Sequence, residues 1–163
     1  MIISPKKSLG QNFLIDQKVI NLITELGTIN NQDIVLEVGP GLGNLTEKIL
    51  EKKPKEFIVI EKDIRLANHL NEKFGDRIKV INEDMLKFSY SEYSDKKLII
   101  FGNLPYNIST QILTKWIKIK NLESFCKKFI LMFQKEVADR IIAETNSKSY
   151  GRLSIISKWK MKV

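Results

Sequence analysis

Cysteine, histidine and long apolar runs are scarce in this sequence, and each scarcity excludes a class of protein. Cys126 is the single cysteine, so no disulfide can form within the chain and nothing demands an oxidising compartment. No apolar run approaches the roughly 20 residues that a membrane-spanning helix needs. Residues 1–10 are basic but contain neither the apolar segment nor the small-residue cleavage site of a signal peptide. We therefore expect a cytoplasmic protein with no membrane partner.

Potential metal ligands are also few. The single histidine, His69, has no second histidine or cysteine nearby, which predicts a surface or packing residue and no metal site. The 163 residues and their 43% hydrophobic content suit one globular domain. The formal net charge of +8 agrees equally well with a nucleic-acid partner and with a lysine-rich surface kept for solubility.

A strand, a glycine loop and a helix follow one another between residues 34 and 53. The apolar run 34–38 leads into three glycines at 39, 41 and 43, and Asn44 with Glu47 resembles a capping box at the start of a helix. A dinucleotide fingerprint would need a glycine where Asn44 stands, and no phosphate-binding Gly-Lys-Ser/Thr is present. The loop therefore favours a nucleoside ligand without a pyrophosphate over NAD or ATP. A tight structural turn remains the alternative.

Acidic residues follow the next two predicted strands. Glu61 comes directly after strand 57–60, where a carboxylate can accept hydrogen bonds from both hydroxyls of a ribose. Asp84 and Met85 follow strand 78–81 and could accept from an exocyclic amine and pack on a purine face. The alternative interpretations are a solvated charge for Glu61 and a turn cap for Asp84.

Strands and helices alternate along the chain, which predicts an α/β doubly wound, mostly parallel sheet with helices on both faces and ligands at the carboxyl ends of its strands. In residues 154–163, apolar Trp159, Met161 and Val163 alternate with three lysines, which predicts a sixth strand with one buried and one basic face. The expected helices are 16–27, 44–53, 64–74, 109–119 and 135–144, and the expected strands are 34–38, 57–60, 78–81, 98–101, 129–133 and 154–163.

The stretch Phe101–Asn107 follows the fourth predicted strand and combines an amide, a stiff turn and an aromatic ring. Pro105 restricts Leu104 to an extended conformation, which holds the Asn103 side chain and the Leu104 carbonyl in a fixed relation. These two oxygens could hold the hydrogens of an adenine amine while Tyr106 stacks on the base. Such catalysis works by orientation and electrostatics and needs no metal.

The N-terminal residues 4–15 show no helix or strand period. They read either as a poorly ordered arm, as chain termini often are, or as a lid whose Gln11, Asn12 and Phe13 reach a ligand.

The motif NLPY at 103–106 resembles the catalytic motif of amino-methyltransferases that use S-adenosylmethionine. With PKKSLGQNFL at 5–14, VLEVGPGLGNLT at 35–46, NLPYNIS at 103–109 and MFQKEVADRI at 132–141, the chain resembles the bacterial small-subunit ribosomal RNA adenine dimethyltransferases over nearly its whole length. That family dimethylates N6 of two adjacent adenosines near the 3′ end of 16S rRNA, releasing S-adenosylhomocysteine. The resemblance implies a Rossmann-like methyltransferase fold and a monomer that acts on the small ribosomal subunit.

The resemblance also implies a role for each matching residue. For the cofactor, its methionine part would be bound by Gln11, Asn12, Gly39, Gly41 and Gly43, its ribose by Glu61 and its adenine by Asp84 and Met85. The target adenine would be held by Asn103, Leu104 and Tyr106, with Asn103 also close to the cofactor.

The chain departs from the family pattern at its end. Members continue with a final strand, a loop with a second aromatic residue and a helical C-terminal domain, none of which follows Val163. We therefore expect an N-terminal arm at 1–15, a catalytic domain at 16–163 from which the final strand and the C-terminal domain are absent, and a cofactor site without full activity. The alternative functions are a 23S rRNA or DNA adenine methyltransferase and a non-catalytic rRNA-binding assembly factor. A nicotinamide-dependent oxidoreductase is disfavoured by Asn44.

Overall fold

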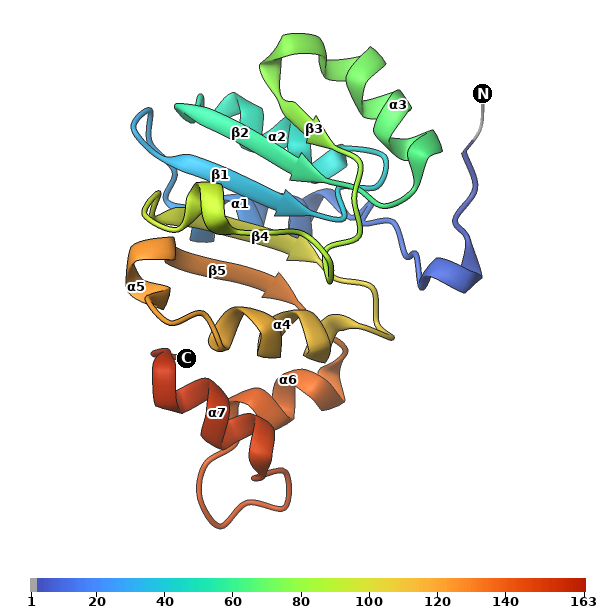
Figure 1. Cartoon of the computed structure of the whole chain (residues 1–163). Helices are drawn as coiled ribbons and strands as arrows, with labels where there is room; N and C mark the ends of the chain where they lie inside the picture. Colours follow the sequence, from blue (N-terminus) through green and yellow to red (C-terminus); the bar gives the residue numbers. More distant parts are fainter. Residues whose placement is uncertain (1–2) are drawn as a thin grey trace.

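The protein forms one parallel five-stranded sheet in the order β3-β2-β1-β4-β5 (Figure 1). The computed structural model describes residues 3–163. Every neighbouring pair of strands is parallel, so all carboxyl ends meet at one edge of the sheet. The strands are β1 (Ile34–Val38), β2 (Glu56–Ile60), β3 (Lys79–Ile81), β4 (Leu98–Asn103) and β5 (Cys126–Met132). The predicted doubly wound architecture is confirmed, with β5 beginning three residues earlier than expected.

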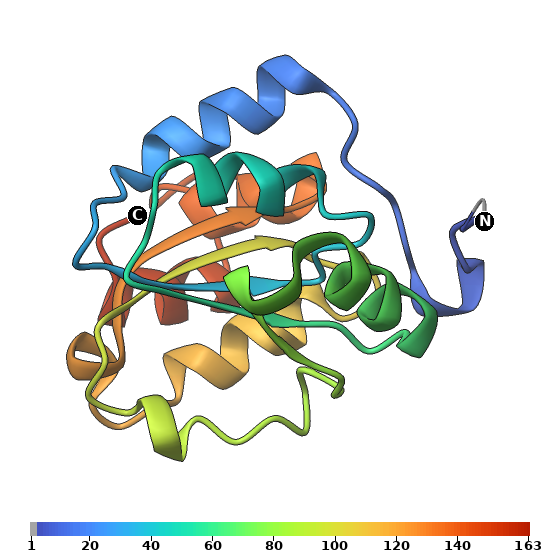
Figure 2. The same ribbon diagram turned by 90° about the horizontal axis from the view of Figure 1, so that it is seen from above.

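Helices cover both faces of the sheet (Figure 2). One face packs against α1, α2 and α3 through a core that includes Ile20, Ile49 and Phe74. The other face packs against α4 and the β3–β4 loop. The helices are α1 (Gln17–Gly27), α2 (Asn44–Glu51), α3 (Ile64–Phe74), α4 (Ser109–Ile117), α5 (Leu122–Phe125), α6 (Lys135–Ile142) and α7 (Arg152–Lys160).

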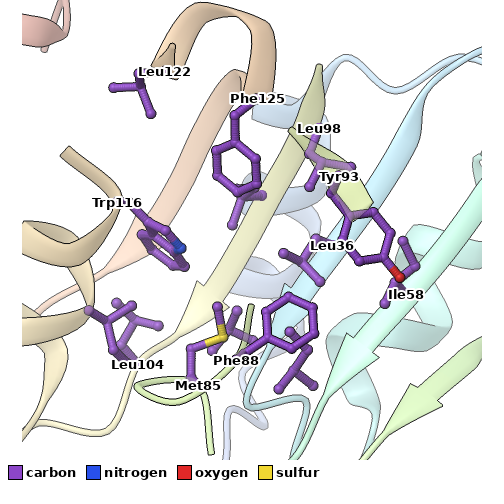
Figure 3. Close-up of a cluster of buried hydrophobic side chains, with 14 residues drawn as sticks. Leu36, Ile58, Met85, Phe88, Tyr93, Leu98, Leu104, Trp116, Leu122 and Phe125 are labelled. Atoms are coloured by element: carbon purple, nitrogen blue, oxygen red, sulfur yellow. The ribbon is translucent and has the colours of Figure 1, made fainter. Parts of the chain in front are cut away.

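The core beneath α4 contains the fully buried Trp116, whose ring stacks on Phe129 with a centroid separation of 5.2 Å. Met85 and Leu104 lie in the same cluster, next to Phe88 (Figure 3). The residues that follow β3 and β4 are therefore anchored by apolar packing at the end of the sheet where we predict a ligand.

Two of the helices begin at a capping aspartate. Asp16 accepts hydrogen bonds from the backbone N–H groups of Lys18 and Val19, and Asp63 caps α3 in the same way through Arg65. The capping box at α2 is wrong, because Gly43 occupies the cap position without a side-chain bond.

The residues of the false capping box make other contacts. The Asn44 side chain donates to the Leu14 carbonyl oxygen at 2.8 Å, and Glu47 pairs with Lys73 on α3 at 3.0 Å. Both side chains are used for tertiary contacts that local spacing does not reveal.

The predicted sixth strand is wrong, because α7 occupies residues 152–160. Ser154 and Ser157 are fully buried three residues apart on one helical face, and the Ser154 hydroxyl donates to the Arg140 carbonyl oxygen on α6 at 2.6 Å. Leu153 and Ile156 pack against α4 and α6. The helix has no buried alternating face, and Trp159 is 73% exposed.

Within residues 3–163, no helix is long and apolar enough to cross a membrane.

Candidate active site

A pocket opens at the carboxyl ends of β1, β2 and β4, between the glycine loop, the β3–β4 loop and the N-terminal arm, residues 4–15. Most residues predicted from the sequence line it, and only Gly43 and Tyr106 lie outside the lining. The predicted residues in the lining are Gln11, Asn12, Phe13, Gly39, Gly41, Glu61, Asp84, Met85, Asn103 and Leu104.

Two glycines of the loop have different structural roles. Gly41 has φ +59°, and a Cβ atom there would lie 3.0 Å from the Phe13 ring, so its missing side chain admits the arm. Gly43 has φ +80°, and a Cβ atom would lie 2.6 Å from Phe74 and 3.0 Å from Leu70. Gly43 therefore allows α2 to pack on α3 and does not face the pocket.

Glu61 lies buried at the end of β2, with 6% of its surface exposed, which contradicts the interpretation as a solvated charge. One carboxylate oxygen accepts from the Asp63 backbone N–H at 2.9 Å, and the other from the Gly41 N–H at 3.4 Å. Burial raises the pKa of Glu61 above its usual value. The carboxylate thus joins the glycine loop to the start of α3.

Asp63, the N-cap of α3, lies beside the pocket and was not predicted from the sequence as a site residue. Its buried carboxylate binds Arg65 at 2.6 Å, lies 3.6 Å from the Lys6 ammonium and accepts from the Gln11 side-chain amide at 3.3 Å. The hydrogen bond from Arg65 holds the pKa of Asp63 well below its usual range. Asp63 therefore anchors the arm, a contact that joins residues 52 positions apart in the chain.

Asp84 caps a turn and also lines the pocket, so its two interpretations are compatible. One oxygen accepts from the Leu86 backbone N–H at 2.9 Å, and the other pairs with the Lys62 ammonium at 2.8 Å. The hydrogen bond from Lys62 lowers the pKa of Asp84, which keeps the carboxylate charged. Met85 is 5% exposed and packs beside Leu104 (Figure 3).

The arm is bound to the last residue of β4 and to the stretch that follows it. The Asn103 side-chain amide donates to the Asn12 carbonyl oxygen at 2.7 Å, and the Asn12 side-chain amide donates to the Tyr106 hydroxyl at 2.8 Å. Among the backbone and side-chain groups that the structure describes, no donor bonds to Asn103 Oδ1 or to the Leu104 carbonyl oxygen. Two adjacent acceptors are therefore available at the pocket, and the arm is ordered against it.

Glu37 lies behind the glycine loop and was missed by sequence reasoning. It is 2% exposed and accepts a hydrogen bond from the Thr46 hydroxyl at 2.7 Å. Complete burial raises the pKa of Glu37 to about 8. The available signal was a single acidic residue within the otherwise apolar strand β1.

Within the described residues, no group of three histidine, cysteine, aspartate or glutamate side chains is arranged to hold a metal ion.

The sequence profile of the family described as ribosomal RNA adenine dimethylase matches residues 3–163. The chain belongs to this family. It is 58% identical over 163 residues to the ribosomal RNA small subunit methyltransferase A of Pelagibacter ubique. The alignment covers the whole of this chain and 62% of that family member, so the chain spans less than two thirds of its relative.

Two solved structures of methyltransferases share the fold of this chain. A dimethyladenosine transferase from Plasmodium falciparum superposes with a TM-score of 0.79 at 32% identity, covering 90% of this chain and 52% of that one. The 23S rRNA methyltransferase ErmE gives a TM-score of 0.70 at 28% identity, covering 90% and 55%. The predicted Rossmann-like methyltransferase fold is confirmed.

Proposed function

We propose that this chain carries the catalytic sites of a small-subunit ribosomal RNA adenine N6,N6-dimethyltransferase. The observation that carries the proposal is the pair of acceptors, Asn103 Oδ1 and the Leu104 carbonyl oxygen, beside the glycine loop. The 58% identity to a named small-subunit methyltransferase supports this substrate over 23S rRNA, because ErmE is only 28% identical. A non-catalytic assembly factor would need no such acceptor pair.

The pocket residues fit S-adenosylmethionine, which supplies a methyl group on a positively charged sulfur when bound. Glu61 would accept from the ribose hydroxyls, and Asp84 would accept from the adenine amine while Met85 packs on the ring. Gln11, Asn12 and the backbone of Gly39 and Gly41 would bind the methionine part. Gly43 supports the loop through its packing on α3 and is removed from the proposed ligand set.

The stretch after β4 would bind the target base. An adenine amine is a poor nucleophile because its lone pair is delocalised into the ring. Asn103 Oδ1 and the Leu104 carbonyl oxygen can accept its two hydrogens, which favours a geometry with the lone pair free to attack. Tyr106, which is 43% exposed, can stack on the base. The base must leave its own stack to reach these groups.

The arm would act as a lid over this site. The side-chain amide nitrogen of Asn103 donates a hydrogen bond to the carbonyl oxygen of Asn12. Oδ1 of Asn103 is then the atom left to accept from a ligand amine. We propose that residues 3–15 form this lid and residues 16–163 the catalytic domain; residues 1 and 2 of the predicted arm lie outside the described residues. We further propose a cytoplasmic monomer that acts without a metal on two adjacent adenosines of 16S rRNA and releases S-adenosylhomocysteine.

Titration calorimetry tests the cofactor. We expect one equivalent of S-adenosylhomocysteine to bind, because the glycine loop, Glu61 and Asp84 provide a complete nucleoside site. NAD should give no heat, because Asn44 stands where a pyrophosphate-binding fingerprint needs its last glycine. Binding of NAD in preference to S-adenosylhomocysteine, or no heat from either, would overturn the proposed function.

The RNA substrate can be identified by reverse transcription. After incubation with S-adenosylmethionine and unmethylated ribosomal subunits, we expect termination at two adjacent adenosines near the 3′ end of 16S rRNA, because dimethylated adenine cannot form a normal base pair. New termination in 23S rRNA alone would identify a large-subunit enzyme instead.

A further inference from the structure

The side chain of Lys115, on α4, is hydrogen-bonded to the backbone of the loop that follows β3. Its ammonium donates to the carbonyl oxygens of Leu86 and Phe88, each at 2.8 Å, and to that of Met85 at 3.3 Å. Within residues 3–163, these three carbonyls accept no other hydrogen bond. Three donors on one tetrahedral ammonium therefore satisfy three outward-facing carbonyls of one loop.

The same loop presents Asp84 and Met85 to the pocket. Its backbone turns around Asp84, whose carbonyl oxygen accepts from the N–H groups of Lys87 and Phe88 at 2.8 and 3.0 Å. It has no ladder hydrogen bonds to hold it, because β3 ends at Ile81. Contacts made by its carbonyls therefore act together with the apolar packing of Met85 and Phe88 to fix where Asp84 lies.

Lys115 is well placed to transmit the position of α4 to this loop. It lies one turn after Ile112, which is fully buried and lines the pocket beside Met85. Its ammonium also lies 4.9 Å from the centroid of the Tyr90 ring, which covers it. An ammonium can direct its three donors at three converging carbonyls, whereas the donors of a guanidinium are held in one plane, so the geometry suits lysine.

We propose that Lys115 is a positioning residue for recognition of the cofactor's adenine. Its ammonium fixes residues 84–88 so that the Asp84 carboxylate meets the exocyclic amine and Met85 meets the ring, while Lys115 itself touches no ligand. This inference rests on the proposed function, because it assumes that the pocket binds an adenosyl group.

The test compares two ligands that differ at one position of the base. S-adenosylhomocysteine presents an amine to Asp84, whereas S-inosylhomocysteine presents a carbonyl oxygen that the carboxylate repels. We expect wild-type protein to prefer the adenosyl ligand. In Lys115→Met, affinity for S-adenosylhomocysteine should fall about tenfold and the preference should shrink by a similar factor, the size expected for losing hydrogen bonds from a charged donor.

Lys158→Met is the matched control. Lys158 also caps a carbonyl, that of Ala143 at 2.8 Å, but it lies on α7 away from the pocket. It should leave the affinity and the preference unchanged. A general loss of stability would lower the affinity for both ligands equally. An unchanged preference of folded Lys115→Met for S-adenosylhomocysteine over S-inosylhomocysteine would therefore overturn the inference. Failure of wild-type protein to bind S-adenosylhomocysteine would instead refute the proposed function.

Hydrogen exchange gives a readout that needs no ligand. In Lys115→Met, the backbone amides of Leu86, Lys87 and Phe88 should exchange faster than in wild type and in Lys158→Met. Unchanged exchange at these amides would show that the ammonium does not hold the loop and would overturn the inference. If Lys115→Met does not fold, Lys115→Gln permits the comparison with a smaller expected change, because its amide keeps at most two donors for the three carbonyls.

Discussion

Asn103→Ala is expected to reduce single-turnover methyl transfer to unmethylated small subunits by about two to three orders of magnitude, the size found when one preorganised hydrogen-bonding group of an active site is removed. The variant loses Oδ1, one of the two acceptors that hold the target amine. Affinity for RNA should be retained, because a single neutral amide adds little to binding that lysines and arginines dominate. The measurement is radiolabelled methyl transfer beside RNA binding by filter retention.

Asn103→Asp serves as the comparison for this variant. It keeps an acceptor oxygen but loses the amide N–H that donates to the Asn12 carbonyl oxygen. We expect it to retain more activity than Asn103→Ala, because the acceptor contributes to the chemistry and the donor only to orientation. Equal activity of Asn103→Ala and wild type would show that Asn103 does not hold the reacting amine.

Glu37→Gln is expected to stabilise the protein at neutral pH, by an amount on the order of 3 kcal/mol. The pKa of Glu37 lies near 8 in the folded protein against an ordinary value of 4.5. Below the ordinary value both states hold the proton, so the charge costs nothing. Between 4.5 and 8 the unfolded chain releases its proton while the folded protein retains it, so wild-type stability falls by up to about 1.4 kcal/mol per pH unit.

Urea denaturation across this pH range measures the effect. The difference in unfolding free energy between Glu37→Gln and wild type should grow as the pH rises from 4.5 and level off above 8. Glu61 is also buried with a raised pKa, so part of the slope should persist in the variant. Glu47→Gln, at an exposed position that pairs with Lys73, is the control and should not flatten the profile. A difference that stays constant with pH would mean that Glu37 is ionised in the folded protein.

The position of the site followed from sequence because parallel strands bring their carboxyl ends together. Gly39, Glu61 and Asp84 come after a strand and Asn103 ends one, so their convergence needed only the fold class. Spacing alone could not separate Gly41 from Gly43, since both adopt positive φ and only the packing of α2 on α3 distinguishes them.

The errors arose where long-range contacts overrule local pattern. Alternating apolar and basic residues at 158–163 suggested a strand. The segment is instead a helix, because buried Ser154 and Ser157 and the apolar Leu153 and Ile156 pack on α6 and α4. Asp63 and Glu37 were missed for a related reason. Their importance lies in burial and in partners that no local spacing reveals.

The contacts of Asn12 have a kinetic consequence for the proposed enzyme. Its backbone binds Asn103 and its side chain binds Tyr106, while the neighbouring Gln11 binds Asp63 beside the ribose site. One short segment therefore spans the donor half and the acceptor half of the reaction. Because the segment is already bound to both halves of the site, we expect it to couple donor binding to acceptor binding, and it must open between successive methyl transfers for the spent donor to be exchanged.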